Sequence, residues 1–202
     1  MSELTSGKIL CITNDFGPRA GGIETFVMGL IERAPKGSII VYTSAQGDTT
    51  SYDQGWLRDF GVEVIRDSSK ILLPSPWVVR RVKKVIARDS IKEVFFGAAA
   101  PLGVMARSLR KKGVVNIVAL THGHEVWWAK LWPFSSAISF IGRNVDHLTY
   151  LGEFTKNEIS KALSPKAKSK LVKIAPGIDT DHFAPDPTAV KLRRDLGLAD
   201  KK

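Results

Sequence analysis

The chain has 202 residues, of which 44% are hydrophobic and 25% charged, fractions that exclude a disordered or fibrous protein. Thirty Lys and Arg against twenty Asp and Glu give a formal net charge of +10, which favours polyanionic partners: nucleic acid, an anionic membrane or phosphorylated substrates. The single Cys11 excludes an internal disulfide, and no apolar run is long enough for a signal peptide or a membrane span. We therefore expect a cytoplasmic protein.

Short apolar runs alternate with helical patterns from residue 8 to about residue 175. Strands are predicted at 9–13, 39–43, 62–65, 93–96, 114–120, 147–151 and 171–174. Apolar residues recur at helical spacing between several of these runs. Strands that are apolar throughout, separated by amphipathic helices, indicate an α/β fold with a doubly wound parallel Rossmann-like sheet covered on both faces. Ligands of such sheets bind at the carboxyl ends of the strands.

A loop that contains adjacent glycines, residues 14–22, follows the first predicted strand and leads directly into a helix. Gly21 and Gly22 at a helix start allow a bulky group to approach free backbone N–H groups, and the helix dipole favours phosphate there. The loop has neither the dinucleotide pattern G-x-G-x-x-G nor a P-loop lysine. The alternative is a tight turn that requires glycine and binds nothing.

The segment 76–88 predicts an amphipathic helix whose outer face is basic. Docking on an anionic membrane is favoured, since each basic residue near such a surface contributes about 1 kcal/mol. The predicted membrane-binding residues are Trp77, Arg80, Arg81, Lys83, Lys84 and Arg88. Leu72 and Leu73 are further candidates for insertion, together with Trp77. The alternative is a helix whose valines pack on the sheet and whose charges face water.

Two later segments have several interpretations. Trp127, Trp128 and Trp132 lie within six residues of each other and, with the apolar residues beside them, could line an acyl-chain groove, sit at a membrane interface, pack in the core or meet another domain. Proline-spaced polar sequence after residue 176 is typical of an interdomain linker. We therefore predict a domain over 1–175, followed by a linker and the start of a second domain over 176–202.

Several segments carry a family resemblance. Residues 14–24 (N-D-F-G-P-R-A-G-G-I-E) resemble the opening of family 4 glycosyltransferases, which have the two-domain GT-B fold. Residues 175–179 (A-P-G-I-D), with Phe183 and Pro185, resemble that family's signature near the domain boundary. Residues 96–102 (F-G-A-A-A-P-L) and 121–125 (T-H-G-H-E) are similar to actinobacterial phosphatidylinositol mannoside mannosyltransferases of the PimB type. The resemblance covers essentially the whole chain.

The resemblance implies a retaining enzyme that moves mannose from GDP-mannose to a phosphatidylinositol monomannoside at the inner face of the plasma membrane. The family binds its donor mainly through the carboxyl-terminal domain, so that domain is an implied partner and the chain by itself should turn over little. No cofactor and no metal are implied. Two alternatives remain: a family 4 enzyme with a soluble phosphorylated acceptor, and a non-catalytic module that binds anions or nucleic acid. The chain has no nucleic-acid recognition motif, so nucleic acid is not the expected partner.

The resemblance also implies roles for individual residues. Gly21 and Gly22 would face the donor diphosphate, and His122 is the catalytic candidate beside the transferred sugar. The acceptor-side candidates are Asn14, Asp15, Arg19, His124 and Glu125. Asp15, His124 and Glu125 have the alternative role of shaping their loops. Glu24 is interpreted as a helix-start acid that complements the dipole, and not as half of a catalytic carboxylate pair.

Overall fold

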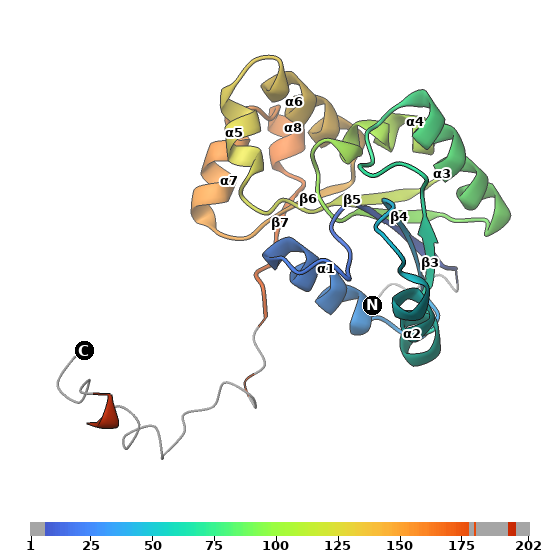
Figure 1. Cartoon of the computed structure of the whole chain (residues 1–202). Helices are drawn as coiled ribbons and strands as arrows, with labels where there is room; N and C mark the ends of the chain where they lie inside the picture. The colour runs from blue at the N-terminus through green and yellow to red at the C-terminus, as the bar shows by residue number, and fades with distance from the viewer. Residues whose placement is uncertain (1–6, 178–179, 181–193, 197–202) are drawn as a thin grey trace.

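The computed structural model describes residues 7–177, 180 and 194–196 (Figure 1). The predicted linker therefore lies almost wholly outside the described residues, as do Asp179, Phe183 and Pro185 of the signature.

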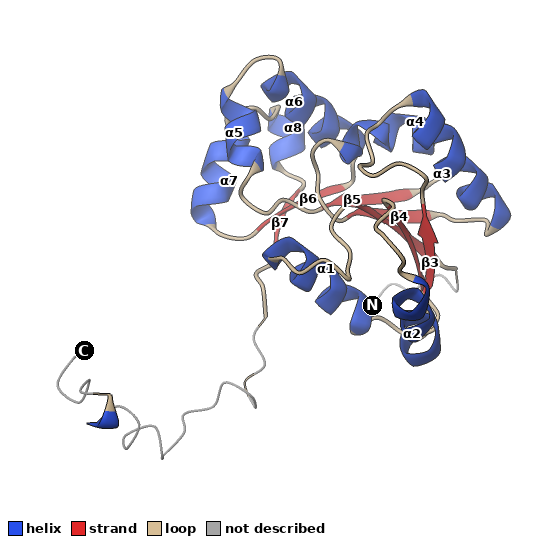
Figure 2. Ribbon diagram, in the orientation of Figure 1, coloured by secondary structure: helices blue, strands red, loops and turns tan. Residues whose placement is uncertain are grey.

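Seven strands form one sheet in which every hydrogen-bonded pair is parallel (Figure 2). They are β1 (Ile9–Thr13), β2 (Ile39–Thr43), β3 (Glu63–Arg66), β4 (Glu93–Phe96), β5 (Asn116–Ala119), β6 (His147–Tyr150) and β7 (Leu171–Lys173). Their order is β3-β2-β1-β4-β5-β6-β7. The predicted α/β class and the doubly wound parallel sheet are confirmed.

The helices alternate with the strands. They are α1 (Gly22–Glu32), α2 (Thr50–Phe60), α3 (Pro76–Arg88), α4 (Ala106–Arg110), α5 (Glu125–Lys130), α6 (Phe134–Asn144), α7 (Glu153–Ser160) and α8 (Pro165–Lys168), with a 3-10 turn, η1 (Leu102–Met105), before α4. Helix α3 starts sharply because the Ser75 hydroxyl accepts a hydrogen bond from the Val78 N–H at 3.3 Å and Pro76 occupies the first turn.

Two cores form because successive side chains of a strand point to opposite faces. On one face, α3, α4 and α6 pack over a large core that includes Leu10, Ile12, Val82, Leu109 and Ile141. On the other face, α1 and α2 cover β1, β2 and β3 through Cys11, Val27, Val41 and Trp56. Figure 1 shows these layers above and below the sheet.

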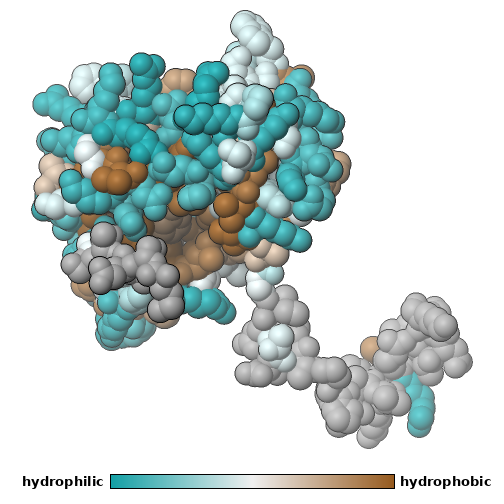
Figure 3. Space-filling view, turned by 180° about the vertical axis from the view of Figure 1, so that it is seen from behind, coloured by the Kyte–Doolittle hydropathy of each residue, from teal (hydrophilic) through white to brown (hydrophobic). Residues whose placement is uncertain are grey.

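The described residues leave part of the second face open. A hollow of about 240 Å³ lies over β4 and β5, where Phe95 and Val118 form its floor and Leu30 of α1 and Ile174 border it. The space-filling view from behind shows hydrophobic side chains around a hollow on this side (Figure 3). Helices flank both faces of the sheet as expected, and this hollow lies beside α1 over β4 and β5.

Candidate functional site

The strand order places a crevice at the carboxyl edge of the sheet. The chain builds outward from β1 in one direction and from β4 in the other, so the strand order reverses between these neighbours. Open α/β sheets bind ligands at this switch point. The glycine loop (residues 14–22) follows β1, Gly97 follows β4, and His122 lies three residues beyond β5.

Side chains from the loop after β2 and from the end of β3 hold the glycine loop by its carbonyl groups. Gln46 Nε2 donates to the Phe16 carbonyl at 2.6 Å, and an Arg66 Nη2–H donates to the Gly17 carbonyl at 2.7 Å. Asp53 fixes the Arg66 guanidinium with hydrogen bonds of 2.7 and 2.9 Å. The loop is thus ordered before any ligand arrives.

The Asn14 side chain ties the glycine loop to the segment before α3. Its Oδ1 accepts the Leu72 N–H at 2.7 Å, and its Nδ2 donates to the Leu72 carbonyl at 3.0 Å. Both polar groups of this side chain have a partner inside the protein. An acceptor contact by Asn14 stays a prediction.

The two adjacent glycines have different surroundings. Gly21 is the N-cap of α1, and a Cβ atom there would lie 2.2 Å from Glu24 Oε2. Glu24 is buried in the first turn, as expected for a helix-start acid, and Arg19 Nε donates to its Oε1 at 2.8 Å. A Cβ atom at Gly22 would meet nothing within 4 Å. Gly22 is therefore the open position of the pair.

We expect alanine substitutions at Gly21 and Gly22 to have different effects on the free energy of unfolding. Gly21→Ala should lower the free energy of unfolding by about 1–2 kcal/mol, because the new methyl group displaces the buried Glu24 carboxylate from Arg19. Gly22→Ala should leave it unchanged or raise it by up to about 1 kcal/mol, because alanine favours the helix and has open space there. Urea unfolding of both variants measures the difference. Equal stabilities would contradict the described contact between Gly21 and Glu24.

Asp15 lies within electrostatic reach of both predicted histidines. Burial raises the pKa of its carboxyl, and the nearby Glu24 raises it further, while Arg19, His122 and His124 act in the opposite direction. Arg19 Nη2 lies 3.7 Å from Asp15 Oδ1. Four of the predicted site residues thus share one charge network.

His122 is held at both its backbone and its ring. Its ring Nε2 lies 2.5 Å from the Gly97 carbonyl oxygen, and the ring packs edge-on against Phe26 with 5.5 Å between ring centroids. Because a carbonyl only accepts hydrogen bonds, Nε2 is the donor here. In the neutral ring, Nδ1 is then the atom left to accept a hydrogen bond from a ligand.

Glu125 shapes the loop that carries His122. Its side chain is fully buried, and its Oε2 accepts the His122 backbone N–H at 2.9 Å. Its Oε1 lies 3.3 Å from His124 Nε2 and accepts no hydrogen bond from the described residues. Gly123, which lies between His122 and His124, has φ +99°, a conformation that favours glycine. Of the two roles left open for Glu125, these contacts favour loop shaping.

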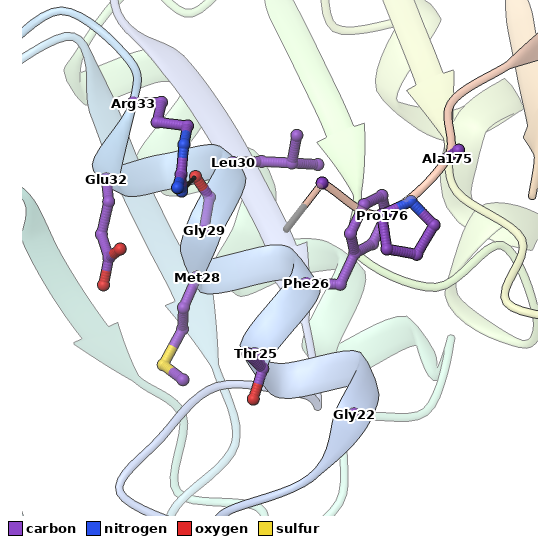
Figure 4. Close-up of a pocket in the computed structure, with 11 residues that line it drawn as sticks. Gly22, Thr25, Phe26, Met28, Gly29, Leu30, Glu32, Arg33, Ala175 and Pro176 are labelled. Carbon is purple, nitrogen blue, oxygen red and sulfur yellow. Dashed lines mark hydrogen bonds between the residues drawn. The ribbon is translucent and has the colours of Figure 1, made fainter. Parts of the chain in front are cut away.

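One of the two predicted donor-binding glycines lies beside the catalytic candidate. Gly22 and His122 line a single hollow of about 270 Å³, together with Phe26, Leu151 and Pro176. A second hollow of about 480 Å³ continues from it along α1 and shares Gly22, Phe26 and Pro176. Figure 4 shows Phe26 lying against Pro176 at this junction. Gly22 at the end of the glycine loop, His122 and Pro176 of the signature therefore lie around one hollow.

The predicted basic face of α3 is only partly available. Arg81 donates two hydrogen bonds, of 2.7 and 2.8 Å, to the buried Asp67 carboxylate. Arg88 pairs with Glu63 and Asp89. Within the described part of the chain, the cations of α3 without an acidic partner are Arg80, Lys83 and Lys84. Membrane binding by the predicted set stays a prediction, and these three are its cations without an acidic partner in that part of the chain.

Of the residues predicted to insert into the bilayer, some are buried and others are exposed. Leu72 is fully buried, so the prediction that it inserts into a bilayer is wrong. It faces the core because Asn14 binds its backbone. Leu73 and Trp77 are exposed, at 55% and 68% of their surface.

The tryptophan-rich segment is mostly at the surface. Trp127 and Trp132 are 71% and 83% exposed, whereas Trp128 packs partly against the core and against Phe134. Core packing is therefore wrong for Trp127 and Trp132. The other interpretations of these two residues stay open.

Sequence reasoning missed the residues that hold the site in place. No sequence motif includes Gln46, Arg66 or Phe26. A charged residue at the carboxyl end of a strand was the available signal for Arg66, since that edge of the sheet faces the ligand. Among the described residues, no group of three or more His, Cys, Asp and Glu could hold a metal ion.

A doubly wound parallel sheet with a glycine loop at its switch point defines the Rossmann-like class of α/β protein. The sequence model of Glycosyltransferase Family 4 matches residues 20–182, and the chain belongs to that family.

Curated relatives within this family have specific names. The chain is 37% identical over 195 residues to the GDP-mannose-dependent alpha-(1-6)-phosphatidylinositol monomannoside mannosyltransferase of Mycolicibacterium smegmatis, covering 96% of this chain and 50% of that protein. It is 34% identical to the corresponding enzyme of Corynebacterium glutamicum, named for a monoacylated acceptor, with 96% and 51% covered. The chain spans about half the length of the curated relatives it matches.

Solved structures agree on the fold. The chain superposes on Anabaena Alr3699/HepE in complex with UDP with a TM-score of 0.66 at 18% identity, covering 96% of this chain and 50% of that one. A glycosyltransferase from Rickettsia africae gives a TM-score of 0.59 at 12% identity, with 97% and 51% covered.

Proposed function

We propose that the chain is the amino-terminal, acceptor-side half of a retaining mannosyltransferase that moves mannose from GDP-mannose to a phosphatidylinositol monomannoside. The identity to enzymes with these names supports the substrates. The observation that carries the proposal is the single hollow lined by Gly22 and His122 at the switch point.

The proposed roles follow from the geometry of this hollow. Negative charge grows on the donor diphosphate as the glycosidic bond breaks, and the N–H groups at the start of α1 are fixed dipoles that can stabilise it without reorganisation. The chain begins this helix at Gly22 without a side-chain cap. His122 accepts a hydrogen bond from the transferred sugar through Nδ1, while Gly97 holds the ring in place.

The proposal places the enzyme on the inner face of the plasma membrane. Arg80, Lys83 and Lys84 supply the attraction to anionic lipid, and the exposed Leu73 and Trp77 supply apolar contact. None of the helices in the described residues is long and apolar enough to cross a bilayer. The docking that we propose is peripheral.

The test is mannose transfer by the full-length protein that contains this chain. Incubation with GDP-mannose and phosphatidylinositol monomannoside should yield the dimannoside, whereas the 202-residue chain alone should yield little. Gly22→Ala in the full-length protein should raise the KM for GDP-mannose about tenfold with stability retained, because its methyl group enters the diphosphate-binding hollow.

Each alternative function predicts a different result. Transfer to a soluble phosphorylated acceptor, with none to the lipid, would replace the proposed acceptor. Tight, salt-sensitive binding of RNA or DNA without any sugar transfer would replace the enzyme with a nucleic-acid-binding module.

A further inference from the structure

One buried carboxylate beside the candidate site is only half satisfied. Glu125 is fully buried at the first residue of α5, and its Oε2 accepts the His122 backbone N–H at 2.9 Å. Its Oε1 accepts no hydrogen bond from the described residues and lies 3.3 Å from His124 Nε2. A buried acceptor without a partner costs free energy, so stability alone does not explain a carboxylate at this position.

Other contacts anchor the histidine loop on either side of the bond to Glu125. The Thr121 hydroxyl donates to the Thr149 carbonyl at 2.5 Å, which fixes the loop where it leaves β5. The Gly97 carbonyl holds the His122 ring. Between these two anchors, the His122 backbone N–H has its partner in Glu125. Glu125 therefore sets the orientation of the peptide group that joins Thr121 to His122.

The two histidine rings of the loop lie nearly parallel. The ring centroids of His122 and His124 are 6.5 Å apart, and the angle between the planes is 11°. A carboxylate only accepts hydrogen bonds, so the His124 Nε2 that faces Glu125 is suited to donate. The His122 Nε2 donates to the Gly97 carbonyl in the same way. In their neutral forms, both rings then have Nδ1 left as an acceptor for hydroxyl groups of a ligand.

We propose that Glu125 is a positioning residue of the transfer reaction. Its Oε2 holds the main chain of His122 where the ring meets the transferred sugar. Its Oε1 keeps His124 Nε2 as a donor, so that His124 Nδ1 accepts a hydroxyl group of the acceptor substrate. The inference rests on the proposed function and deepens it. Because Glu125 is fully buried, it acts through the two histidines and touches no substrate.

Two variants of the full-length protein separate the position of the carboxylate from its charge. Glu125→Asp keeps the charge but is one methylene shorter, so its oxygens no longer reach both histidines. Its kcat for mannose transfer should fall about 30-fold, because a small misplacement of a group at the reacting centre is costly. Glu125→Gln loses the charge but keeps an oxygen for the His122 N–H, so its kcat should stay within about threefold of the parent.

The KM for the acceptor reports the contact with His124. In Glu125→Gln, the side-chain amide turns an N–H group toward His124 Nε2, which then has to accept and leaves a donor at Nδ1. The KM for phosphatidylinositol monomannoside should therefore rise about fivefold, while the KM for GDP-mannose stays within about twofold. Steady-state kinetics with each substrate varied in turn gives both values.

Glu158→Gln is the matched control. Glu158 lies on α7 and pairs with Lys130 of α5 at 3.2 Å, so it anchors the opposite end of the helix that begins at Glu125. The kcat and both KM values of this variant should stay within about twofold of the parent. A loss equal to that of Glu125→Asp would show that any disturbance of α5 lowers turnover, and would overturn the positioning role.

Amide hydrogen exchange of the 202-residue chain, followed by NMR, gives a readout that needs no activity. The His122 N–H should exchange about tenfold faster in Glu125→Asp than in the parent or in Glu125→Gln. The Leu120 N–H donates to the Phe96 carbonyl at 3.0 Å and should keep its exchange rate in all three proteins. Equally accelerated exchange at Leu120 would show a general structural role and overturn the proposal.

The remaining outcomes also decide. A Glu125→Asp variant that keeps its kcat, or a Glu125→Gln variant that loses as much, overturns the positioning of His122, and an unchanged acceptor KM in Glu125→Gln overturns that of His124. If Glu125→Asp does not fold, the kcat and acceptor KM of Glu125→Gln decide alone. A parent protein without mannose transfer would overturn the proposed function, whereas His122 exchange still shows whether Glu125 holds the loop.

Discussion

Replacing His122 with alanine is expected to lower kcat of the full-length protein about 100-fold or more. The ring is held by the Gly97 carbonyl and lines the same hollow as Gly22, where the transferred sugar is proposed to lie. Removing one preorganised hydrogen-bonding group from a reacting centre typically costs this much. The KM for GDP-mannose should change little, since the diphosphate contacts remain. Steady-state kinetics with both substrates varied provides the measurement.

His147→Ala is the matched control for this variant. His147 is exposed at the first residue of β6, which places it at the amino edge of the sheet, away from the switch point. Its kcat should equal that of the parent. If His122→Ala keeps near-normal turnover, His122 does not have the proposed role, whatever the acceptor proves to be.

Replacing Asp67 with asparagine is expected to lower the free energy of unfolding by about 3 kcal/mol. The Asp67 carboxylate is fully buried and accepts hydrogen bonds from Arg81, the Tyr42 hydroxyl and the Ser69 N–H. Removing one partner of a buried ion pair leaves the other charge without compensation. An asparagine amide would also turn a donor toward the Arg81 guanidinium. Chemical denaturation measures the loss.

Asp59→Asn is the control for charge removal alone. Asp59 pairs with its neighbour Arg58 at the surface, where both side chains are about half exposed or more. Such pairs contribute little, so the change should stay within about 0.5 kcal/mol. Equal effects at Asp59 and Asp67 would contradict the described burial of the Asp67 network.

The same network predicts how stability depends on pH. Burial opposes ionisation of Asp67, yet hydrogen bonds from Arg81, Tyr42 and Ser69 lower its pKa to about 2. A depressed pKa stabilises the folded state above about pH 4, and this contribution of about 2 kcal/mol is lost as pH falls toward 2. Burial and the Asp67 hydrogen bond raise the pKa of Tyr42 to about 12, so its contribution is lost as pH rises from 10 toward 12. Asp67→Asn should flatten the acid side of the profile.

Much of the fold was predictable because its signals are local. Every predicted strand is present, since runs such as 39–43 are apolar throughout, and α3 has its full predicted length from Pro76 to Arg88. Helix α2 was not predicted because its apolar residues are sparse in a polar segment, although Trp56 packs in the core. The strand predicted over 114–120 is shorter, because pairing with β4 covers only Asn116 to Ala119.

Residues of the candidate site were predictable only where they belong to a sequence motif. Gly22 and His122 were found from motifs, and the structure places them in one hollow. The Arg66 contact with Gly17 joins residues 49 positions apart, and the pairing of Asn14 with Leu72 joins residues 58 positions apart. No local pattern specifies such contacts. For the same reason, the predicted basic face of α3 included Arg81, whose partner Asp67 precedes the helix and is buried.

The open part of the sheet over β4 and β5 has a practical consequence for anyone who purifies the chain. Fluorescent dyes such as ANS bind accessible apolar surface and are commonly used to diagnose a molten globule. The hollow floored by Phe95 and Val118 offers such a surface in the fully packed molecule. Strong dye fluorescence from a sample that unfolds cooperatively and keeps its near-ultraviolet dichroism would therefore report this hollow and not loss of tertiary order.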